Sequence, residues 1–178
     1  RHVQHITVQD TTKPVITGTP ADITYACASD VPTASNTSVS ASDNCAGTVT
    51  VSVSDAISGQ SCANKYTITR TWTATDVCGN SSTSQQIIRV NDSISPMFTS
   101  QLPSDTTVNC NSIPTAPTIT ASDNCGLVQV TLDETATQGG CSGAGGFIRT
   151  WTARDTCGNF VRHVQHITVQ DTTKPVIT

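Results

Sequence analysis

The stretch "RTWTATDVCGN" at residues 70–80 returns as "RTWTARDTCGN" at residues 149–159, with nine of eleven positions identical. Ahead of each cysteine, Thr side chains alternate with larger or apolar ones, which is typical of a strand with one buried face. The Gly-Asn pair after the cysteine supplies turn residues. The repetition predicts two copies of one β module, each with a strand that ends in this turn.

The cysteines support the same division. "ASDNC" at 41–45 recurs at 121–125, and the cysteines form two equivalent sets: Cys27, Cys45, Cys62, Cys78 and Cys110, Cys125, Cys141, Cys157. Residues 1–17 are also identical to residues 162–178. We therefore predict these segments: 1–13, the last strand of a preceding module plus a linker; 14–95, repeat one; 96–174, repeat two; 175–178, the start of a next module.

Composition favours an all-β fold. The chain is 35% apolar and only 12% charged, with a net charge of −4, and it is rich in the β-branched residues that suit strands. No basic patch with interleaved aromatics is present, which argues against nucleic-acid binding. No apolar run approaches the ~20 residues that cross a bilayer, so this segment is not expected to span a membrane.

Alternating patterns predict the strands of the first module near 15–26, 34–43, 48–55, 65–75 and 80–91. Ile68, Trp72 and Ala74 share one face of the fourth strand, and Ile88 and Val90 of the fifth match Ile167 and Val169 in the second module. One buried and one hydroxyl-rich face describe an antiparallel β-sandwich. The predicted fold is therefore all-β: two tandem immunoglobulin-like antiparallel β-sandwich modules, each stapled by disulfides.

The eight cysteines predict disulfides rather than zinc, because the close Cys pairs of zinc sites are missing, and disulfides imply an oxidising, extracytoplasmic location. The strand path puts Cys62 and Cys78 at opposite ends of a long strand, too far apart for a bond. Cys27 pairing with Cys45 is the main rival to our assignment. The predicted bonds are Cys27–Cys62, Cys45–Cys78, Cys110–Cys141 and Cys125–Cys157.

These blocks, together with strands that end in "VNDSISP" or "VQDTTKP", resemble the HYR-like immunoglobulin-type repeats of giant Bacteroidetes cell-surface adhesins, including gliding-motility adhesins of the SprB type. The resemblance covers nearly the whole chain. It implies a secreted, bacterial, tandem array that serves as a stalk or adhesive filament, and no cofactor. Bacteroidetes O-glycosylation at Asp-Ser/Thr motifs adds candidate acceptors, which would make the protein a glycoprotein: Thr11, Ser93, Thr106 and Thr172.

Carboxylates gather where the strand path brings neighbouring modules together. Calcium takes several oxygen ligands, so a joint site is one hypothesis, and the competing hypothesis is that each Asp accepts hydrogen bonds from its own turn. The candidate ligands are Asp10, Asp43 and Asp76 at one joint and Asp92, Asp123 and Asp155 at the next. Arg70 and Arg149 share a face with Trp72 and Trp151, which predicts arginines stacked on indoles.

No catalytic motif is present: we find no nucleophile elbow, no H-E-x-x-H and no phosphate-binding loop followed by a helix. The expected function is a structural stalk or filament segment of a large secreted adhesin, which gives reach and rigidity for surface attachment or gliding. The alternative is a glycan- or protein-binding module that uses exposed loops. Expected partners are neighbouring repeats, and beyond them surface polysaccharide or other filament chains.

Overall fold

The computed structural model of the chain describes residues 1–178 apart from 46, 111, 142–143, 172–173 and 175–178, and it describes only the backbone of 138–141 and 144. The chain divides into two units, Arg1–Asp92 and Ser93–Thr178. The division falls inside the predicted joint "NDSISP" at 91–96. In the described ranges, no helix is both long and apolar enough to cross a membrane.

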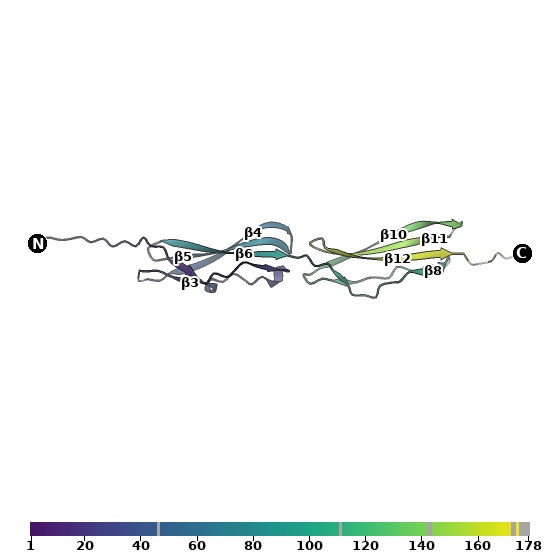
Figure 1. Cartoon of the computed structure of the whole chain (residues 1–178), viewed down its shortest axis with the longest axis horizontal. Coiled ribbons are helices and arrows are strands. Elements are labelled where there is room, and N and C mark those ends of the chain that lie inside the picture. The colour runs from purple at the N-terminus through teal and green to yellow at the C-terminus, as the bar shows by residue number, and fades with distance from the viewer. Residues whose placement is uncertain (46, 111, 142–143, 172–173, 175–178) are drawn as a thin grey trace. The chain divides into compact units, whose positions relative to one another are not determined.

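The first unit has a large sheet of four strands in the order β2-β6-β5-β4 and a small sheet of two strands, β1-β3 (Figure 1). Two short 3-10 turns precede β3. The elements are β1 (Val15–Thr17), β2 (Ile23–Tyr25), η1 (Ala28–Asp30), η2 (Asn36–Ser38), β3 (Ser40–Ser42), β4 (Thr50–Cys62), β5 (Lys65–Thr75) and β6 (Ser81–Asn91).

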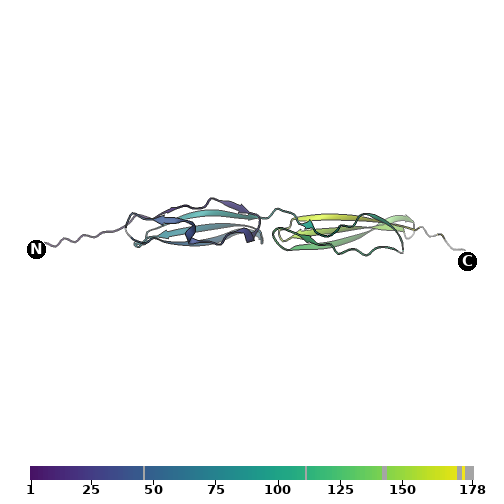
Figure 2. The same ribbon diagram turned by 90° about the horizontal axis from the view of Figure 1, so that it is seen from below.

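The second unit repeats this plan with a four-stranded sheet in the order β10-β11-β12-β8 and a small sheet, β7-β9. Within each unit, the long strands lie on one side and most of the short strands and connecting segments on the other (Figure 1), and Figure 2 shows the same elements from below. The elements are β7 (Met97–Phe98), β8 (Thr106–Asn109), β9 (Ala121–Ser122), β10 (Val128–Cys141), β11 (Ala144–Asp155) and β12 (Phe160–Gln170).

The predicted all-β fold and its buried faces are confirmed. Trp72 and Trp151 are 1% and 2% exposed and lie at the centre of their units. The indole N–H of Trp72 donates to the Ser35 carbonyl at 2.9 Å, so its polar group is satisfied. Around them lie the apolar side chains of the same strand faces, which are all buried: Ile68, Ala74, Ile88, Val90, Ala153, Ile167 and Val169.

The first predicted strand, 15–26, is split between the two sheets. Gly18 has φ of +78°, a conformation that favours glycine, and Pro20 lacks the N–H that a continuous strand would need. β1 therefore pairs with β3, and β2 crosses to the large sheet, where it pairs with β6 in parallel. Each unit thus has one parallel pair (β2–β6, β8–β12) in an otherwise antiparallel fold.

The segment 57–64, expected to be a loop, belongs largely to the β4–β5 hairpin. β4 continues to Cys62, with a shift of register between Ser58 and Cys62, where Gly59 has φ of +64°. In the second unit, β10 likewise runs to Cys141 and includes part of the Gly-rich stretch at residues 139–146. Alternation fades in both stretches, so the sequence pattern did not reveal these strand ends.

Candidate functional site

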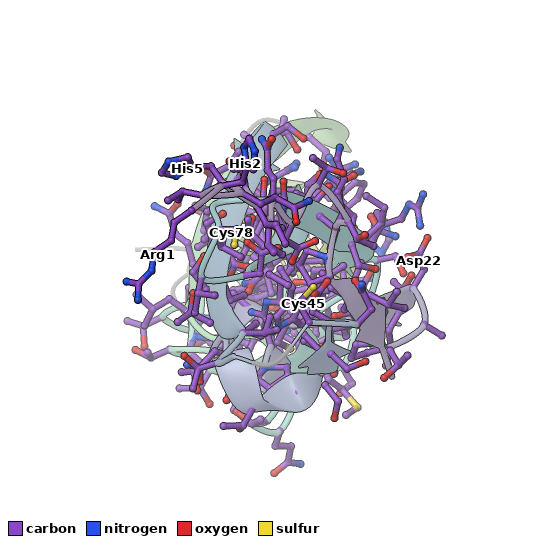
Figure 3. The ribbon with its side chains drawn as sticks, turned by 90° about the vertical axis from the view of Figure 1, so that its left-hand side faces the viewer. Arg1, His2, His5, Asp22, Cys45 and Cys78 are labelled. Carbon is purple, nitrogen blue, oxygen red and sulfur yellow. The ribbon has the colours of Figure 1, made fainter. Side chains whose placement is uncertain are left out.

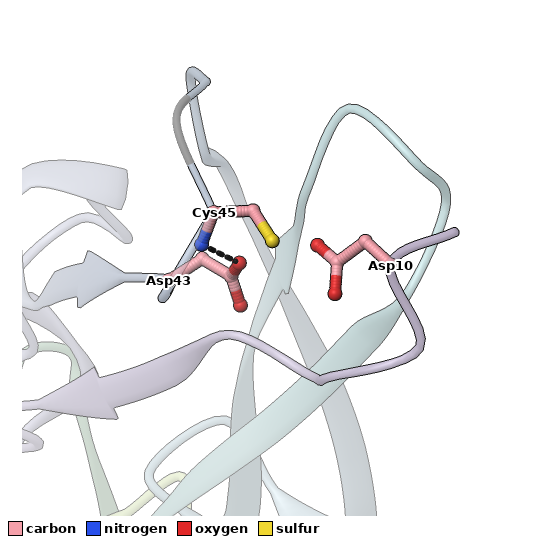
Figure 4. A group of neighbouring side chains, drawn as sticks. All are labelled: Asp10, Asp43 and Cys45. Atoms are coloured by element: carbon pink, nitrogen blue, oxygen red, sulfur yellow. Dashed lines mark hydrogen bonds between the residues drawn. The ribbon is translucent and has the colours of Figure 1, made fainter. Parts of the chain in front are cut away.

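The described residues of the first unit bring Asp10, Asp43 and Cys45 together. One ligand atom from each lies within 4.8 Å of the others (Figure 4). Asp10 precedes β1, and the other two follow β3. Because β1 and β3 are paired, the sheet itself brings these two distant segments into contact.

Asp43 holds the turn that contains Cys45. Its Oδ1 accepts a hydrogen bond from the Cys45 backbone N–H at 3.0 Å (Figure 4). Its Oδ2 is buried and has no hydrogen-bond partner in the described part of the chain. A buried carboxylate oxygen without a partner is costly, so a bound cation or a proton would stabilise this position.

Asp10 is fixed by its neighbours and faces the Cys45 thiol. Its Oδ1 accepts from the Thr12 N–H at 2.9 Å, and its carbonyl accepts from the Asn80 side chain at 3.1 Å. The pKa of Cys45 is raised, first by its hydrogen bond to Asp10, then by burial and by the negative charges of Asp10 and Asp43. Cys45 is therefore held as a thiol, which is less nucleophilic than a thiolate.

Asp76, the third predicted ligand of the first unit, is committed to the repeated turn. Its Oδ1 accepts from the backbone N–H groups of Cys78 (2.9 Å) and Asn80 (2.8 Å), and its Oδ2 accepts from the Asn80 side chain at 2.9 Å. Burial alone would raise the pKa of Asp76, but these bonds and one from the Gly79 backbone outweigh it, and the net effect lowers the pKa. Asp76 therefore fits the hypothesis that each Asp accepts hydrogen bonds from its own turn better than it fits the hypothesis of a calcium ligand.

The second unit builds the same turns. Asp155 Oδ1 accepts from the N–H groups of Cys157 (2.8 Å) and Asn159 (2.9 Å), and its Oδ2 accepts from the Asn159 side chain at 2.7 Å. Asp123 Oδ1 accepts from the Cys125 N–H at 2.9 Å, and its Oδ2 is buried without a hydrogen-bond partner in the described chain. Asp92 lies at the end of the first unit, where its own N–H donates to the Asn64 carbonyl at 2.9 Å.

The first unit contains one of its two predicted staples. Cys27 and Cys62 are disulfide-bonded, as their predicted pairing requires. Cys45 and Cys78 are exposed free thiols, so the structure lacks the predicted bond between them. The Cys45 thiol lies beside the Asp10 carboxylate, with its sulfur within 4.8 Å of a carboxylate oxygen.

The second unit has the opposite arrangement. Cys125 and Cys157, the equivalents of Cys45 and Cys78, are disulfide-bonded. Cys110 is an exposed free thiol, and the predicted Cys110–Cys141 bond involves a side chain that the structure does not describe. The side chain of Cys141 lies outside the described residues. The two copies together show both kinds of staple within one fold.

The candidate glycosylation sites differ in access. Thr11 and Ser93 are exposed; Thr11 precedes β1, and Ser93 lies between β6 and β7. Thr106 opens β8, is half-buried and is paired with Ile167 of β12. Thr172 lies outside the described residues.

Several interactions that the sequence did not reveal recur in both units. The sequence predicted that Arg70 stacks on an indole. Its recorded partners are instead Asp55, with which it forms an ion pair at 2.8 Å, and the Pro32 carbonyl, to which it donates a hydrogen bond at 2.9 Å. Arg149 makes the equivalent contacts with Glu134 (2.5 Å) and the Pro114 carbonyl (2.8 Å). Both guanidinium groups thereby tie the long hairpin to the segment that crosses beneath it.

A second recurrent set fastens the last strand of each unit. The buried Gln86 side chain donates to the Ala21 carbonyl at 2.6 Å, and Asp22 accepts from the Ile87 N–H at 2.8 Å. In the second unit the buried Gln165 donates to the Ser104 carbonyl at 2.8 Å, and Asp105 accepts from the His166 N–H at 2.7 Å. The sequence feature that could have indicated these contacts is the presence of Gln and Asp at equivalent positions in the two copies.

Comparisons with known proteins complete the description. Residues 15–90 match the family described as a HYR-like domain with 4 cysteines. No curated protein matches the sequence.

Solved structures with a similar arrangement include a cis-dimer of protocadherin gammaB7 EC3-6 (17% identity, 92% of this chain and 52% of that chain, TM-score 0.35). They also include protocadherin gamma B2 domains 1–5 (16% identity, 94% and 42%, 0.36) and Drosophila N-cadherin EC1-4 (14% identity, 90% and 50%, 0.36). The chain thus spans about half of these structures or less. The family match lies within the first unit and shows that this part of the chain is similar to HYR-like domains.

Proposed function

We propose that this chain is a structural repeat segment of a large secreted cell-surface adhesin, where it gives reach and rigidity to a stalk or filament. Attachment and gliding on surfaces are the activities that such a segment serves in the giant Bacteroidetes adhesins that the sequence resembles. The segment itself carries no catalytic role in this proposal.

One observation carries the proposal: the two units repeat the same internal fastenings. Arg70 with Asp55 and Arg149 with Glu134 occupy equivalent places. The turns built by Asp76 and Asp155 match bond for bond. Selection for a ligand site diversifies loops, whereas selection for a uniform rod favours copies with the same internal supports.

The disulfides support an extracellular location. Among the cysteines whose side chains are described, Cys27, Cys62, Cys125 and Cys157 are disulfide-bonded, and such bonds persist in oxidising compartments. Sugars on Thr11 and Ser93, both exposed, would shield the segments on either side of the first unit's strands.

Small-angle X-ray scattering of the purified chain, combined with a glycan array, tests the proposal. A single compact body of 178 residues would have a radius of gyration of about 16 Å. A rod segment is expected to give a clearly larger value and no specific glycan signal. A compact radius, or saturable binding to one glycan class, would contradict the proposal and favour a binding module.

We further propose that Asp10 and Asp43 hold a calcium ion that stiffens the entry to the first unit. The buried, unpartnered Oδ2 of Asp43, close to the Asp10 carboxylate, supports it. A thiol is a poor calcium ligand, so the Cys45 side chain would turn away and water and backbone carbonyls would complete the shell.

Thermal unfolding measured with calcium and with chelator tests this site. The midpoint is expected to rise with calcium in the wild type and in Cys45→Ser, and to stay constant in Asp43→Asn. An unchanged midpoint in the wild type would rule the site out.

A further inference from the structure

Three exposed side chains lie together on the large sheet of the second unit. Phe160, the first residue of β12, is 45% exposed. The guanidinium carbons of Arg154 and Arg162 each lie 4.9 Å from the centre of its ring. At this distance a guanidinium is attracted to the face of an aromatic ring. We call Arg154, Phe160 and Arg162 the arginine cluster.

The pairing of β11 with β12 brings the arginine cluster together. Arg154 is the cross-strand partner of Phe160, and Arg162 follows Phe160 by two positions, so the three side chains share one face of the sheet. The other face of β11 carries Trp151 and Ala153, which are both buried. The arginine cluster therefore lies on the solvent side of the sheet, where a partner can reach it.

The two guanidinium groups of the cluster have no carboxylate partner. None of the ion pairs in the described part of the chain includes Arg154 or Arg162. Arg154 Nη1 donates to the Gly158 carbonyl at 2.9 Å, which helps to fix its position but leaves its charge uncompensated. Asp133 shares the face, but it pairs with Thr150, four residues along β11 from Arg154. The cluster is thus a positive site on a chain whose net charge is −4.

The first unit is built without this cluster. The equivalent positions in β5 and β6 hold Thr75, Ser81 and Thr83, with the same cross-strand pairing. Figure 3 looks onto this end of the first unit, where Cys78 lies in the turn between the two strands. Since the first unit forms the same sheet with small hydroxyl side chains there, the fold does not require the two arginines and the phenylalanine.

The spacing of the two charges fits the carboxylates of an extended peptide. Both guanidinium carbons lie 4.9 Å from one ring centre, so they are at most twice that distance apart. In an extended chain, side chains at alternate positions point to one side at intervals of ~6.6 Å. Two acidic residues at positions i and i+2 can therefore each meet one guanidinium, which binds a carboxylate through two parallel hydrogen bonds.

We propose that the arginine cluster is a docking site for an extended protein segment with acidic residues at alternate positions. The proposal does not depend on the adhesin role. Stacking on Phe160 orders both guanidinium groups before the segment binds, which lowers the entropy cost of binding. Val164, on the same face and 43% exposed, offers a further apolar contact to the methylene groups of acidic side chains. The hydroxyl groups of an acidic polysaccharide fit these apolar side chains less well, because burying them without hydrogen bonds is costly.

Fluorescence anisotropy with the full chain tests the proposal. The probe is a labelled synthetic peptide of alternating Glu and Thr residues, which is expected to bind and to bind more weakly as salt is added. The double variant Arg154→Thr, Arg162→Thr carries threonine at both positions, as the first unit does. It should bind about tenfold more weakly, because it loses two exposed ion pairs that each contribute modestly.

The control for charge is the double variant Lys65→Thr, Arg89→Thr, which removes two exposed positive charges from the first unit. It should bind the peptide as the wild type does. No binding by the wild-type chain, or an equal loss in the control, would overturn the proposal.

Moving the cluster to the first unit separates docking from any damage to the second. The triple variant Thr75→Arg, Ser81→Phe, Thr83→Arg places the same side chains on β5 and β6 and should double the number of peptides bound per chain in titration calorimetry. An unchanged number would contradict the proposal.

Polygalacturonate, a carboxylated polysaccharide, tests the nature of the partner. At an equal concentration of carboxylates it should fail to displace the peptide from the wild-type chain. Displacement would show that the arginine cluster binds acidic polysaccharide instead of a protein segment.

Discussion

The hydrogen bonds of one aspartate in each unit explain why the same turn sequence occurs twice. In "TDVCGN" and "RDTCGN", the carboxylate of Asp76 or Asp155 accepts hydrogen bonds from N–H groups two and four residues later, and the Asn side chain returns to the same carboxylate. Gly79 and Gly158 take φ of +89° and +93°, which favours glycine. The motif is therefore a turn between two core strands whose polar groups form hydrogen bonds with one another.

The lowered pKa of Asp76 predicts a pH dependence of stability. Because the folded state favours the carboxylate, the contribution of Asp76 is fully present above the unfolded pKa of ~3.9 and is lost as the pH falls through the lower, folded-state pKa. Unfolding by urea from pH 7 to pH 2 should show this loss. Asp76→Asn should flatten the acid limb, whereas Asn at the exposed Asp30 should not; equal profiles would show that the turn carboxylate is not responsible.

The free thiols of Cys45 and Cys78 lead to a prediction about the disulfides of the oxidised chain. Cys125 and Cys157 are disulfide-bonded in the second unit, and their equivalents Cys45 and Cys78 occupy the same turns in the first. We expect Cys45 to leave Asp10 and bond to Cys78 when the chain is oxidised. Non-reducing peptide mapping should then find a peptide that joins Cys45 to Cys78; one that joins Cys27 to Cys45 would refute the assignment.

Between elements, the main fastening is the buried arginine. Arg70 in β5 is 5% exposed and binds Asp55 in β4 through two nitrogens, at 2.8 and 2.9 Å, and also the Pro32 carbonyl. It thereby couples the hairpin to a segment that belongs to neither of its strands. Loss of the carboxylate leaves a buried guanidinium short of acceptors.

Asp55→Ala is therefore expected to lower the free energy of unfolding by about 1.5 kcal/mol, the low end for hydrogen bonds to charged groups, because Asp55 is partly solvated. Ser54→Ala, at the exposed neighbouring position, should have little effect. Chemical denaturation measures both. Equal stability of the two variants would show that Arg70 is supported by the Pro32 carbonyl and by packing alone.

The strands also show which parts of the fold could be predicted from the sequence. The strands around Trp72 and Ile88 were predictable because apolar side chains alternate along them at every second position. The end of β4 was not, because Gly59 and the polar residues around it follow no period. The contacts of Gln86 with Ala21 and of Arg70 with Asp55 join residues distant in sequence, so one sequence could not pair them.

The candidate site was predictable only in part, for the same reason. Asp10 and Asp43 meet because β1 pairs with β3. The sequence placed both residues at a joint between modules but did not specify this pairing. Asp76 was grouped with them because it lies at the same end of the unit, but its turn consumes both carboxylate oxygens. Local hydrogen bonds of this kind depend on backbone geometry that residue types alone do not specify.

At the scale of the whole molecule, the chain is two units with one construction, each with its own core and its own disulfide. A repeat array of this kind is stable unit by unit. The central claim is that each unit resists force as an independent, stapled body.

Single-molecule force extension of the full chain tests that claim most directly. Two separate unfolding events are expected, and each should lengthen the chain by about 3.3–3.6 Å per released residue. Residues between two disulfide-bonded cysteines should not contribute to this length, because the disulfide prevents them from extending. After reduction, both steps should lengthen by the residues that the disulfides enclosed. One cooperative event for the whole chain, or steps unchanged by reduction, would contradict the account.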